Sequence, residues 1–189
     1  MFGVEYIFPT PIWHMEYDAS HMIPHVFDLR EQDQGRKVSN VGGWQSNDIP
    51  PDTEWTQEFI KAVVKKIPYF MDEFGDSTKK LEFDNMWFNI NPSGAVNLDH
   101  IHGGSFLSGV LWLVAPEGSG NIVFSRSTHE SYILYSNVQN PNRRCGFTDW
   151  QYEPKENLAV IFPSWLSHRV EINNTDSDRV SLAFNLSWK

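Results

Sequence analysis

The sequence predicts a mainly β protein with a jelly-roll fold and helices packed on its outer face. Two observations support this prediction. Helical periodicity is confined to the first half of the chain, and from residue 83 onward apolar residues follow short strand-like runs separated by Gly, Pro and Asn turns. About eight short strands with turns between them are typical of a jelly roll. The 189 residues are enough for one domain, spanning residues 1–189, with a single core.

Two helices are expected before the strands. Ser20 is a candidate N-cap for the first helix, whose first turn accommodates Pro24 and whose apolar stripe includes Val26. The second and longer helix follows Asp52 and Thr53, and its apolar residues recur every three or four positions. These are Trp55, Phe59, Val63, Ile67, Phe70 and Phe74. We interpret this stripe as packing against a sheet.

The strands follow one another with turn formers between them. They are expected at residues 85–91, 96–102, 106–114, 120–125, 131–136, 158–162, 168–172 and 179–187. The last two strands flank a run of turn formers, so we expect them to pair as a hairpin. If the hairpin closes symmetrically, Ile172 lies opposite Arg179, and Arg179 shares a face with His168 about 13 Å along the sheet.

The charge and the absence of certain segments limit the classes of partner. The chain carries 15 Lys+Arg against 24 Asp+Glu, a formal net charge of -9, which disfavours binding to nucleic-acid backbones. The apolar run at 110–115 is too short to span a membrane, and no secretory signal precedes it. Cys145 is the single cysteine, which favours a reducing compartment. We therefore expect a soluble cytoplasmic protein without a membrane partner, and oligomeric state is left open.

A pair of histidines is the strongest functional signal. In a strand, His100 and His102 present their imidazoles to the same side, about 7 Å apart along the backbone. His168, from another strand, could complete a metal site. Three ligands on one face, with the opposite positions open, is the arrangement of non-haem Fe(II) oxygenases, in which a carboxylate is the usual third ligand. Asp99 should point to the opposite face of a regular strand. The alternative is that the histidines only join a hydrogen-bond network.

Arg179 is the second functional signal. A guanidinium binds a carboxylate through two parallel hydrogen bonds, and such an oxygenase needs a cation for the far carboxylate of 2-oxoglutarate. Ser181 should lie on the same face of the strand and could donate a further hydrogen bond. The alternative is a surface ion pair of Arg179 with a nearby acid, which would contribute little to stability. The candidate acids are Glu171, Asp176 and Asp178.

The ordered motifs resemble the 2-oxoglutarate/Fe(II)-dependent oxygenase superfamily, and within it a small branch of bacteria and tailed phages that has H-x-H in place of H-x-D. The resemblance covers residues from about 7 to 187. It rests on Asn89-Ile90-Asn91-Pro92, His100-x-His102, Leu107-Ser108-Gly109-Val110, Gly120-Asn121-Ile122-Val123-Phe124, Phe162-Pro163-Ser164-Trp165-Leu166-x-His168 and Arg179-x-Ser181-x-x-x-Asn185. The segments 8–13 and 42–46 are also similar to that branch.

The resemblance implies a double-stranded β-helix and the cofactors Fe(II), 2-oxoglutarate and O2. It implies a dioxygenase that hydroxylates an unidentified small molecule or protein side chain and releases succinate and CO2, in the host cytoplasm if the protein is phage-encoded. The implied catalytic metal ligands are His100, His102 and His168, and the implied 2-oxoglutarate residues are Arg179, Ser181, Asn89 and Ser108. Two alternatives remain: a three-His jelly-roll metalloenzyme that does not use 2-oxoglutarate, and a non-catalytic jelly-roll binding or assembly protein.

Substrate selection is expected in two places. Residues 125–157 are the part least similar to the family, and loops of this kind carry specificity. The segment 42–46 is the second candidate. Aromatic side chains near the motifs, namely Trp44, Trp87, Trp112 and Trp165, could form walls of a pocket.

Overall fold

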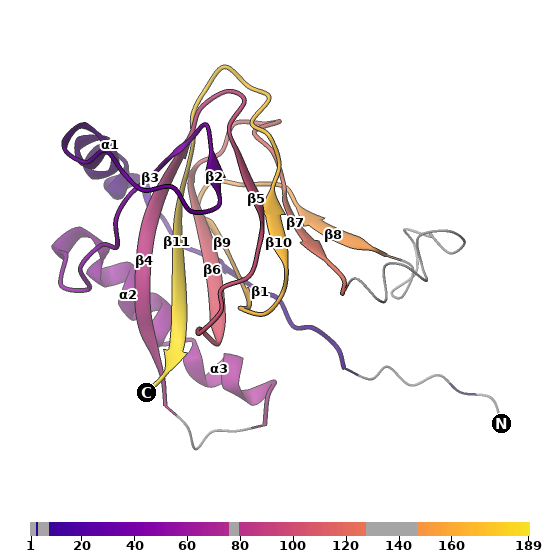
Figure 1. Cartoon of the computed structure of the whole chain (residues 1–189). Helices are drawn as coiled ribbons and strands as arrows, with labels where there is room; N and C mark the ends of the chain where they lie inside the picture. Colours follow the sequence, from indigo (N-terminus) through magenta and orange to yellow (C-terminus); the bar gives the residue numbers. More distant parts are fainter. Residues whose placement is uncertain (1–2, 4–7, 76–79, 128–146) are drawn as a thin grey trace.

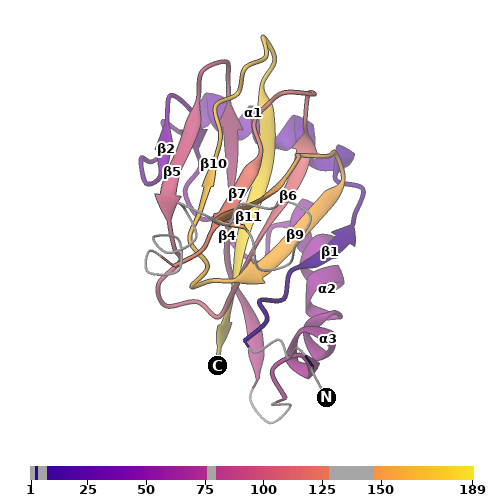
Figure 2. The same cartoon turned by 90° about the vertical axis from the view of Figure 1, so that its right-hand side faces the viewer.

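A computed structural model describes residues 3, 8–75, 80–127 and 147–189. Within these residues eleven strands form two antiparallel sheets that face each other (Figures 1 and 2). The six-stranded sheet contains, in spatial order, β1 (Trp13–Glu16), β9 (Leu158–Pro163), β6 (Leu107–Val114), β11 (Arg179–Trp188), β4 (Leu81–Asn91) and β3 (Trp44–Gln45). The five-stranded sheet contains β2 (Asn40–Val41), β5 (Val96–His100), β10 (His168–Val170), β7 (Ile122–Ser125) and β8 (Asp149–Tyr152). The predicted jelly-roll class is confirmed.

Seven of the eight expected strands correspond to β4, β5, β6, β7, β9, β10 and β11, with bounds that differ by up to four residues. β1, β2, β3 and β8 were not expected, and each has only two to four residues. The expected strand at 131–136 lies outside the described residues, as does Cys145. Within the described part of the chain, no helix combines the length and the apolar character that crossing a membrane requires.

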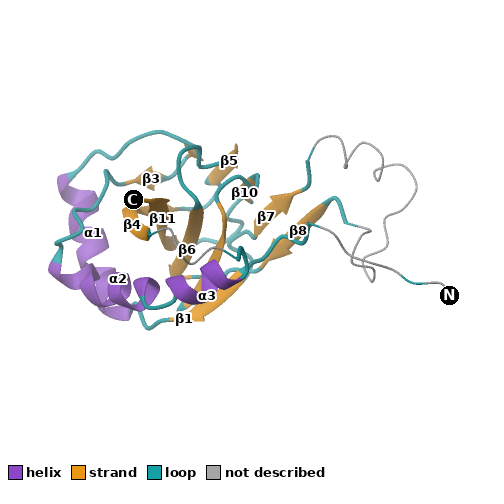
Figure 3. Cartoon of the chain, turned by 90° about the horizontal axis from the view of Figure 1, so that it is seen from below, coloured by secondary structure: helices purple, strands orange, loops and turns teal. Residues whose placement is uncertain are grey.

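The helices lie against the outer face of the six-stranded sheet (Figure 3). They are η1 (Ser20–Met22), α1 (Ile23–Gln32), η2 (Glu54–Thr56), α2 (Gln57–Val64) and α3 (Ile67–Asp72). The expectation of one long second helix was wrong, because Pro68 has no N–H to donate to the preceding turn and the helix is interrupted before it. The apolar stripe nevertheless stays on one side, and most of its residues join the core.

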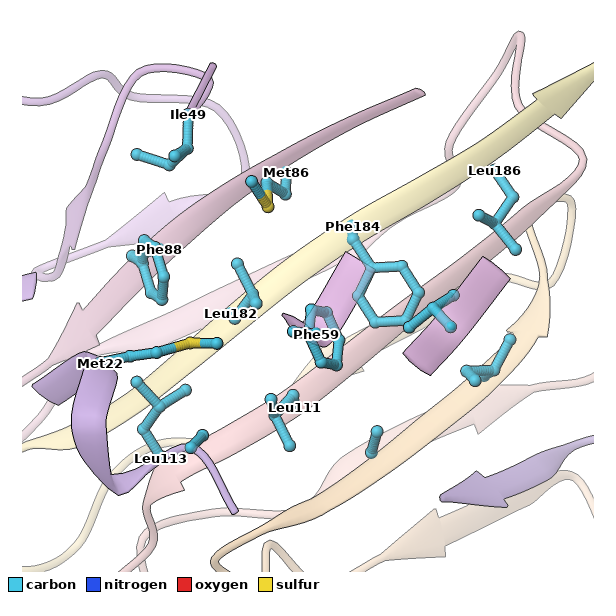
Figure 4. Close-up of a cluster of buried hydrophobic side chains, with 14 of the residues drawn as sticks. Met22, Ile49, Phe59, Met86, Phe88, Leu111, Leu113, Leu182, Phe184 and Leu186 are labelled. Atoms are coloured by element: carbon cyan, nitrogen blue, oxygen red, sulfur yellow. The ribbon is translucent and has the colours of Figure 1, made fainter. Parts of the chain in front are cut away.

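A large core fills the space between helices and sheet (Figure 4). The rings of Phe59 on α2 and Phe184 on β11 are 5.2 Å apart in an edge-to-face arrangement. Close contact with Phe184 also explains why position 109 on β6 is a glycine, since a Cβ at that position would overlap the ring of Phe184. A second core lies between the two sheets and includes Trp112, Phe124 and Phe162.

The predicted hairpin of the last two strands is wrong. β10 pairs with β5 and β7 in one sheet, whereas β11 pairs with β4 and β6 in the other. Arg179 is therefore opposite Asn91 and not Ile172. The ten residues of β11 find longer partners in β4 and β6 than the three residues of β10 could provide. Buried Asn173 holds the crossover, because its Nδ2 donates to the carbonyls of Asn91 and Ser177 at 2.8 and 2.7 Å.

Candidate metal and carboxylate site

A β-bulge in β5 directs the first histidine into the space between the sheets. His168 is opposite His100, and Val170 is opposite Asn97, so two residues of β5 oppose one residue of β10. The two residues are Leu98 and Asp99, and both are exposed. The expected regular strand would have turned Asn97 and His100 to opposite faces, but the bulge lets both line the same cavity.

His102 reaches the site from beyond the end of the strand. The expected strand through residue 102 was wrong, since β5 ends at His100 and the backbone N–H of His102 donates to the carbonyl of Ser164 at 3.0 Å. The ring centre of His102 is 5.1 Å from that of His100 and 5.1 Å from that of His168. The rings of His100 and His168 are 4.3 Å apart. The candidate ligand atoms of all three lie within 4.8 Å of one another.

Hydrogen bonds fix which nitrogen of each ring is free. His100 Nδ1 lies 2.7 Å from the carbonyl of Leu98, and His168 Nδ1 lies 2.9 Å from the carbonyl of Leu166. A carbonyl only accepts, so both Nδ1 atoms carry hydrogen and both Nε2 atoms keep a lone pair. His102 Nδ1 lies 2.6 Å from Asn185 Oδ1, which is also an acceptor. Metal-bound histidines usually have this pattern, with one nitrogen on the ion and the other donating to the protein.

Burial keeps the three imidazoles neutral. Desolvation is the main cause of the lowered pKa values of His100 and His102, and it lowers the pKa of His168 to about 3. Neutral imidazole is the form that binds a metal ion. Asp99 is exposed and is not part of the cluster, so among the described residues the cluster consists of histidines alone. Three neutral nitrogen donors fit a first-row divalent ion and leave its charge uncompensated.

Arg179 lies in the same cavity with an unusual set of partners. Its side chain is 2% exposed, and its Nη1 donates to the carbonyls of Ser119, Gly120 and Glu171. Its Nη2 is buried and has no hydrogen-bond partner. Burial lowers the pKa of Arg179 to about 10, so the guanidinium remains charged at neutral pH. A buried cation with an unpaired donor is expected to hold an anion.

The surface ion pair that was the alternative for Arg179 is not found. Asp178 pairs with Arg30 at 3.4 Å, and Glu171 contributes its backbone carbonyl to Arg179 while its carboxylate accepts from the N–H of Asn121. No described carboxylate forms an ion pair with Arg179. The charge of Arg179 is thus directed to the cavity.

One cavity joins the histidines to Arg179. Between them it is lined by apolar side chains, and no acidic residue is found among the described residues that line it. The polar lining residues are Ser39, Asn89, Asn97 and Ser181, and the other lining residues are Trp87, Gly109, Val110, Trp112, Ile122, Phe162, Val170 and Ala183. Asn89 and Ser181 are opposite each other on β4 and β11, two residues from Arg179 and its partner Asn91. Both line the same cavity as Arg179.

Ser108 lies beside a histidine and does not line the cavity. Its Oγ is 2.9 Å from His102 Nδ1 and donates to Asn185 Oδ1 at 2.7 Å. Of the four tryptophans near the motifs, Trp87 and Trp112 line the cavity. Trp165 is 62% exposed. The segment 42–46 does not line the cavity, and much of 125–157 lies outside the described residues.

Sequence reasoning gave no role to Asn185, Asn97 or Ser39. Asn185 touches His102, and Asn97 and Ser39 line the cavity. A signal for Asn185 was available, because alternate residues of a strand share a face and Asn185 follows Arg179 by six positions. Asn97 could not be found in this way, because the bulge in β5 breaks the alternation.

Comparisons with known proteins agree with this geometry. The sequence model of a family described as "Putative 2OG-Fe(II) oxygenase" matches residues 85–185. No curated protein matches the sequence. Several solved structures share the fold. A Pseudomonas putida prolyl-4-hydroxylase has 14% sequence identity and a TM-score of 0.67, with 94% of this chain and 92% of that chain covered.

Two further structures were solved with 2-oxoglutarate. HygX from Streptomyces hygroscopicus, with nickel and 2-oxoglutarate bound, has 10% identity and a TM-score of 0.61, with 94% of this chain and 83% of that chain covered. A viral collagen prolyl hydroxylase from Paramecium bursaria Chlorella virus-1, in a 2-oxoglutarate complex, has 11% identity and a TM-score of 0.59, with 93% and 94% covered. At these identities the likeness is one of fold. The family match covers more than half of the chain, and the chain belongs to the 2-oxoglutarate/Fe(II) oxygenases, oxidoreductases that use Fe(II), 2-oxoglutarate and O2.

Proposed function

We propose that this chain is a dioxygenase that binds Fe(II) through His100, His102 and His168 and 2-oxoglutarate through Arg179. The observation that carries the proposal is the pairing of two complementary sites in one cavity. Neutral nitrogen donors converge at one end, and a buried, unpaired cation lies at the other. A short dianion with a chelating end and a carboxylate end satisfies both.

The histidines would hold the ion through Nε2, because each Nδ1 already donates to the protein. With the family's cofactors bound, the chemistry supplied would be oxidation of 2-oxoglutarate by O2 to succinate and CO2. The second oxygen atom would be inserted into a C–H bond of the substrate to give a hydroxyl group. The histidines would supply no charge to the ion. An anionic ligand or substrate group would therefore be favoured next to it.

At the far end, Arg179 would hold the distal carboxylate with its free Nη2, while Nη1 remains on backbone carbonyls. Asn89 and Ser181 border the same end and would donate to the carboxylate from its sides. Asn89 Oδ1 is buried without a hydrogen-bond partner, so the Asn89 amide is available to a ligand. Val110, Ile122 and Phe162 lie along the cavity and would contact the methylene groups and exclude water.

The proposal is tested by a comparison of two ligands. Calorimetric titration of the Mn(II)-loaded protein with 2-oxoglutarate and with pyruvate separates the two ends, because pyruvate has the chelating group but no distal carboxylate. We expect 2-oxoglutarate to bind at least about 100-fold more tightly than pyruvate, since charge-assisted hydrogen bonds contribute about 1.5 to 3 kcal/mol each. In Arg179→Ala most of this preference should be lost.

Arg169→Ala is the matched control, because Arg169 is on β10 in the other sheet and its guanidinium bonds to Ser125 and Asp149. This variant should keep the preference for 2-oxoglutarate. Equal affinity for both ligands in the unmodified protein would contradict the role of Arg179. Failure of the metal to bind in the unmodified protein would contradict the role of the histidines.

For the substrate that is oxidised together with 2-oxoglutarate, the proposal names only a chemical class. The solved structures that share the fold include two prolyl hydroxylases and HygX with hygromycin B bound. We propose a small molecule or a protein side chain as the substrate. The net negative charge of the chain disfavours binding to a nucleic-acid backbone.

A further inference from the structure

A row of hydrogen-bonded side chains runs from His102 to the protein surface. His102 Nδ1 contacts Asn185 Oδ1 at 2.6 Å, Asn185 Nδ2 donates to Asn85 Oδ1 at 2.9 Å, and Asn85 Nδ2 donates to Asp48 Oδ2 at 3.2 Å. The other oxygen of Asp48 accepts from Arg36 Nη2 at 2.5 Å. We call the row His102, Asn185, Asn85 and Asp48 the His102 relay.

Only His102 among the three histidines depends on such a row. His100 and His168 each donate Nδ1–H to the backbone carbonyl two residues earlier in their own segment. His102 lies past the end of β5, and its Nδ1 contacts the side chains of Asn185 and Ser108. The backbone therefore sets the tautomer of two rings, and side chains must set the tautomer of the third.

The relay has a direction that Asp48 imposes. An ionised carboxylate only accepts, so Asn85 must turn its Nδ2 toward Asp48 and its Oδ1 toward Asn185. Asn185 must then turn its Nδ2 toward Asn85 and its Oδ1 toward His102. An acceptor at 2.6 Å requires a hydrogen on His102 Nδ1, which leaves the lone pair on Nε2. The opposite tautomer would place two lone pairs against each other.

Ser108 agrees with the same direction. Its hydroxyl donates to Asn185 Oδ1 at 2.7 Å, so its one hydrogen is not available to His102 Nδ1. Its lone pairs face His102 Nδ1 and the hydroxyl of Ser164. Without the amide orientation set by the relay, Ser108 could donate to Nδ1 and stabilise the opposite tautomer.

The backbone holds the relay in place. Asn85 is opposite Asn185 at a bulge, where β4 has one residue more than β11, and bulges redirect side chains in this way. The segment that carries Asp48 follows β3 along β4 (Figure 1). Its backbone is fixed on both sides of Asp48, because the N–H groups of Ser46 and Ile49 donate to β4 carbonyls at 2.9 and 2.8 Å.

We propose that Asp48, Asn85 and Asn185 are positioning residues that keep His102 in the Nδ1–H tautomer, with the Nε2 lone pair directed at the centre of the three histidines. The consequence for metal binding rests on the proposed function. The tautomer is a property of the metal-free protein, and its measurement does not depend on any activity.

The first experiment reads the tautomer directly. Nitrogen NMR of metal-free protein labelled in histidine should show His102 only as the Nδ1–H form in the unmodified protein. Asp48→Asn is the main variant, because Asp48 is at the surface and an amide can offer either a donor or an acceptor to Asn85. We expect at least about one tenth of His102 in the Nε2–H form in this variant.

Two control variants separate the relay from general surface charge. Arg36→Gln removes the ion pair of Asp48 but leaves its bond to Asn85, and Asp178→Asn removes an acid that pairs with Arg30 elsewhere. Both should keep the single tautomer. If Asp48→Asn also keeps it, the proposal is wrong.

The second experiment measures Mn(II) affinity by competition with a chelator. Residues that orient a metal-bound histidine typically contribute 10- to 100-fold in affinity. We expect a loss of that size in Asn185→Leu and a loss of about threefold or more in Asp48→Asn, with the two controls within twofold of the unmodified protein. Unchanged affinity in both relay variants would overturn the positioning role. If the unmodified protein binds no Mn(II), the proposed function fails, and the NMR result alone decides the relay.

Discussion

Acid should destabilise the metal-free protein through His168 in particular. This side chain is 4% exposed, and burial lowers its pKa from 6.5 to about 3 in the folded protein. Between these two pH values the unfolded chain binds a proton at His168 and the folded protein does not. The free energy of unfolding therefore decreases as the pH falls from about 6.5 toward 3.

The magnitude follows from the two pKa values of His168. One pKa unit corresponds to about 1.36 kcal/mol, so the full pH range contributes roughly 4 to 5 kcal/mol. Between pH 7.5 and 5.0 the contribution is about 2 kcal/mol, a large share of the roughly 5 to 15 kcal/mol that stabilises a typical domain. The lowered pKa values of His100 and His102 act in the same direction.

Urea unfolding of chelator-treated protein at pH 7.5 and 5.0 measures this contribution. His168→Gln removes the titrating group, so this variant should lose about 2 kcal/mol less than the unmodified protein between the two pH values. His25→Gln is the matched control, because His25 is exposed on α1 and stacks on Trp55 outside the cavity. An equal loss of stability in His168→Gln and in the unmodified protein would refute the reasoning.

Three further predictions concern packing and the carboxylate end of the cavity. Gly109→Ala should lower the free energy of unfolding by about 1 to 3 kcal/mol in urea unfolding, because the added Cβ overlaps the ring of Phe184. Gly120→Ala should weaken 2-oxoglutarate binding to the Mn(II)-loaded protein, since Gly120 has a φ of 93° and its carbonyl holds Arg179; unchanged affinity by calorimetry would contradict this. Ser181→Ala should weaken 2-oxoglutarate binding about 3- to 20-fold and leave pyruvate binding unchanged in the same assay.

The sequence predicts the chemistry of the site better than the backbone that forms it. His100, His102 and His168 converge as the H-x-H spacing and the later histidine indicate. The backbone conformation that brings them together differs from the predicted regular strand, however, because β5 has a bulge and ends before His102. Periodicity assumes a regular strand, and an extra residue in one strand depends on its partner, which the local sequence does not specify.

The strand pairing that places Arg179 in the cavity also differs from the predicted pairing. It lines the same cavity as His168, but the two residues come from strands of opposite sheets and not from one hairpin. A turn-rich connection is compatible with a hairpin and with a crossover between sheets. The choice depends on which strands offer β11 the longer pairing, and this is a property of the whole sheet.

The helical region was predicted from an apolar periodicity, which continues across an interruption of the helix. The stripe from Trp55 to Phe70 packs into the core as expected, although the helix is divided before Pro68. The His102 relay was beyond sequence reasoning for a different reason. Asp48, Asn85 and Asn185 are far apart in sequence and come together only through the pairing of β3, β4 and β11.

The central claim is that one cavity joins a three-histidine metal site to a buried arginine. The most direct measurement is an anaerobic titration of the Fe(II)-loaded protein with 2-oxoglutarate, followed by visible absorption. We predict a metal-to-ligand charge-transfer band that saturates with 2-oxoglutarate in the unmodified protein and is lost at the same ligand concentration in Arg179→Ala. Bound iron without such a band in the unmodified protein would contradict the claim and would favour a three-histidine enzyme that does not use 2-oxoglutarate.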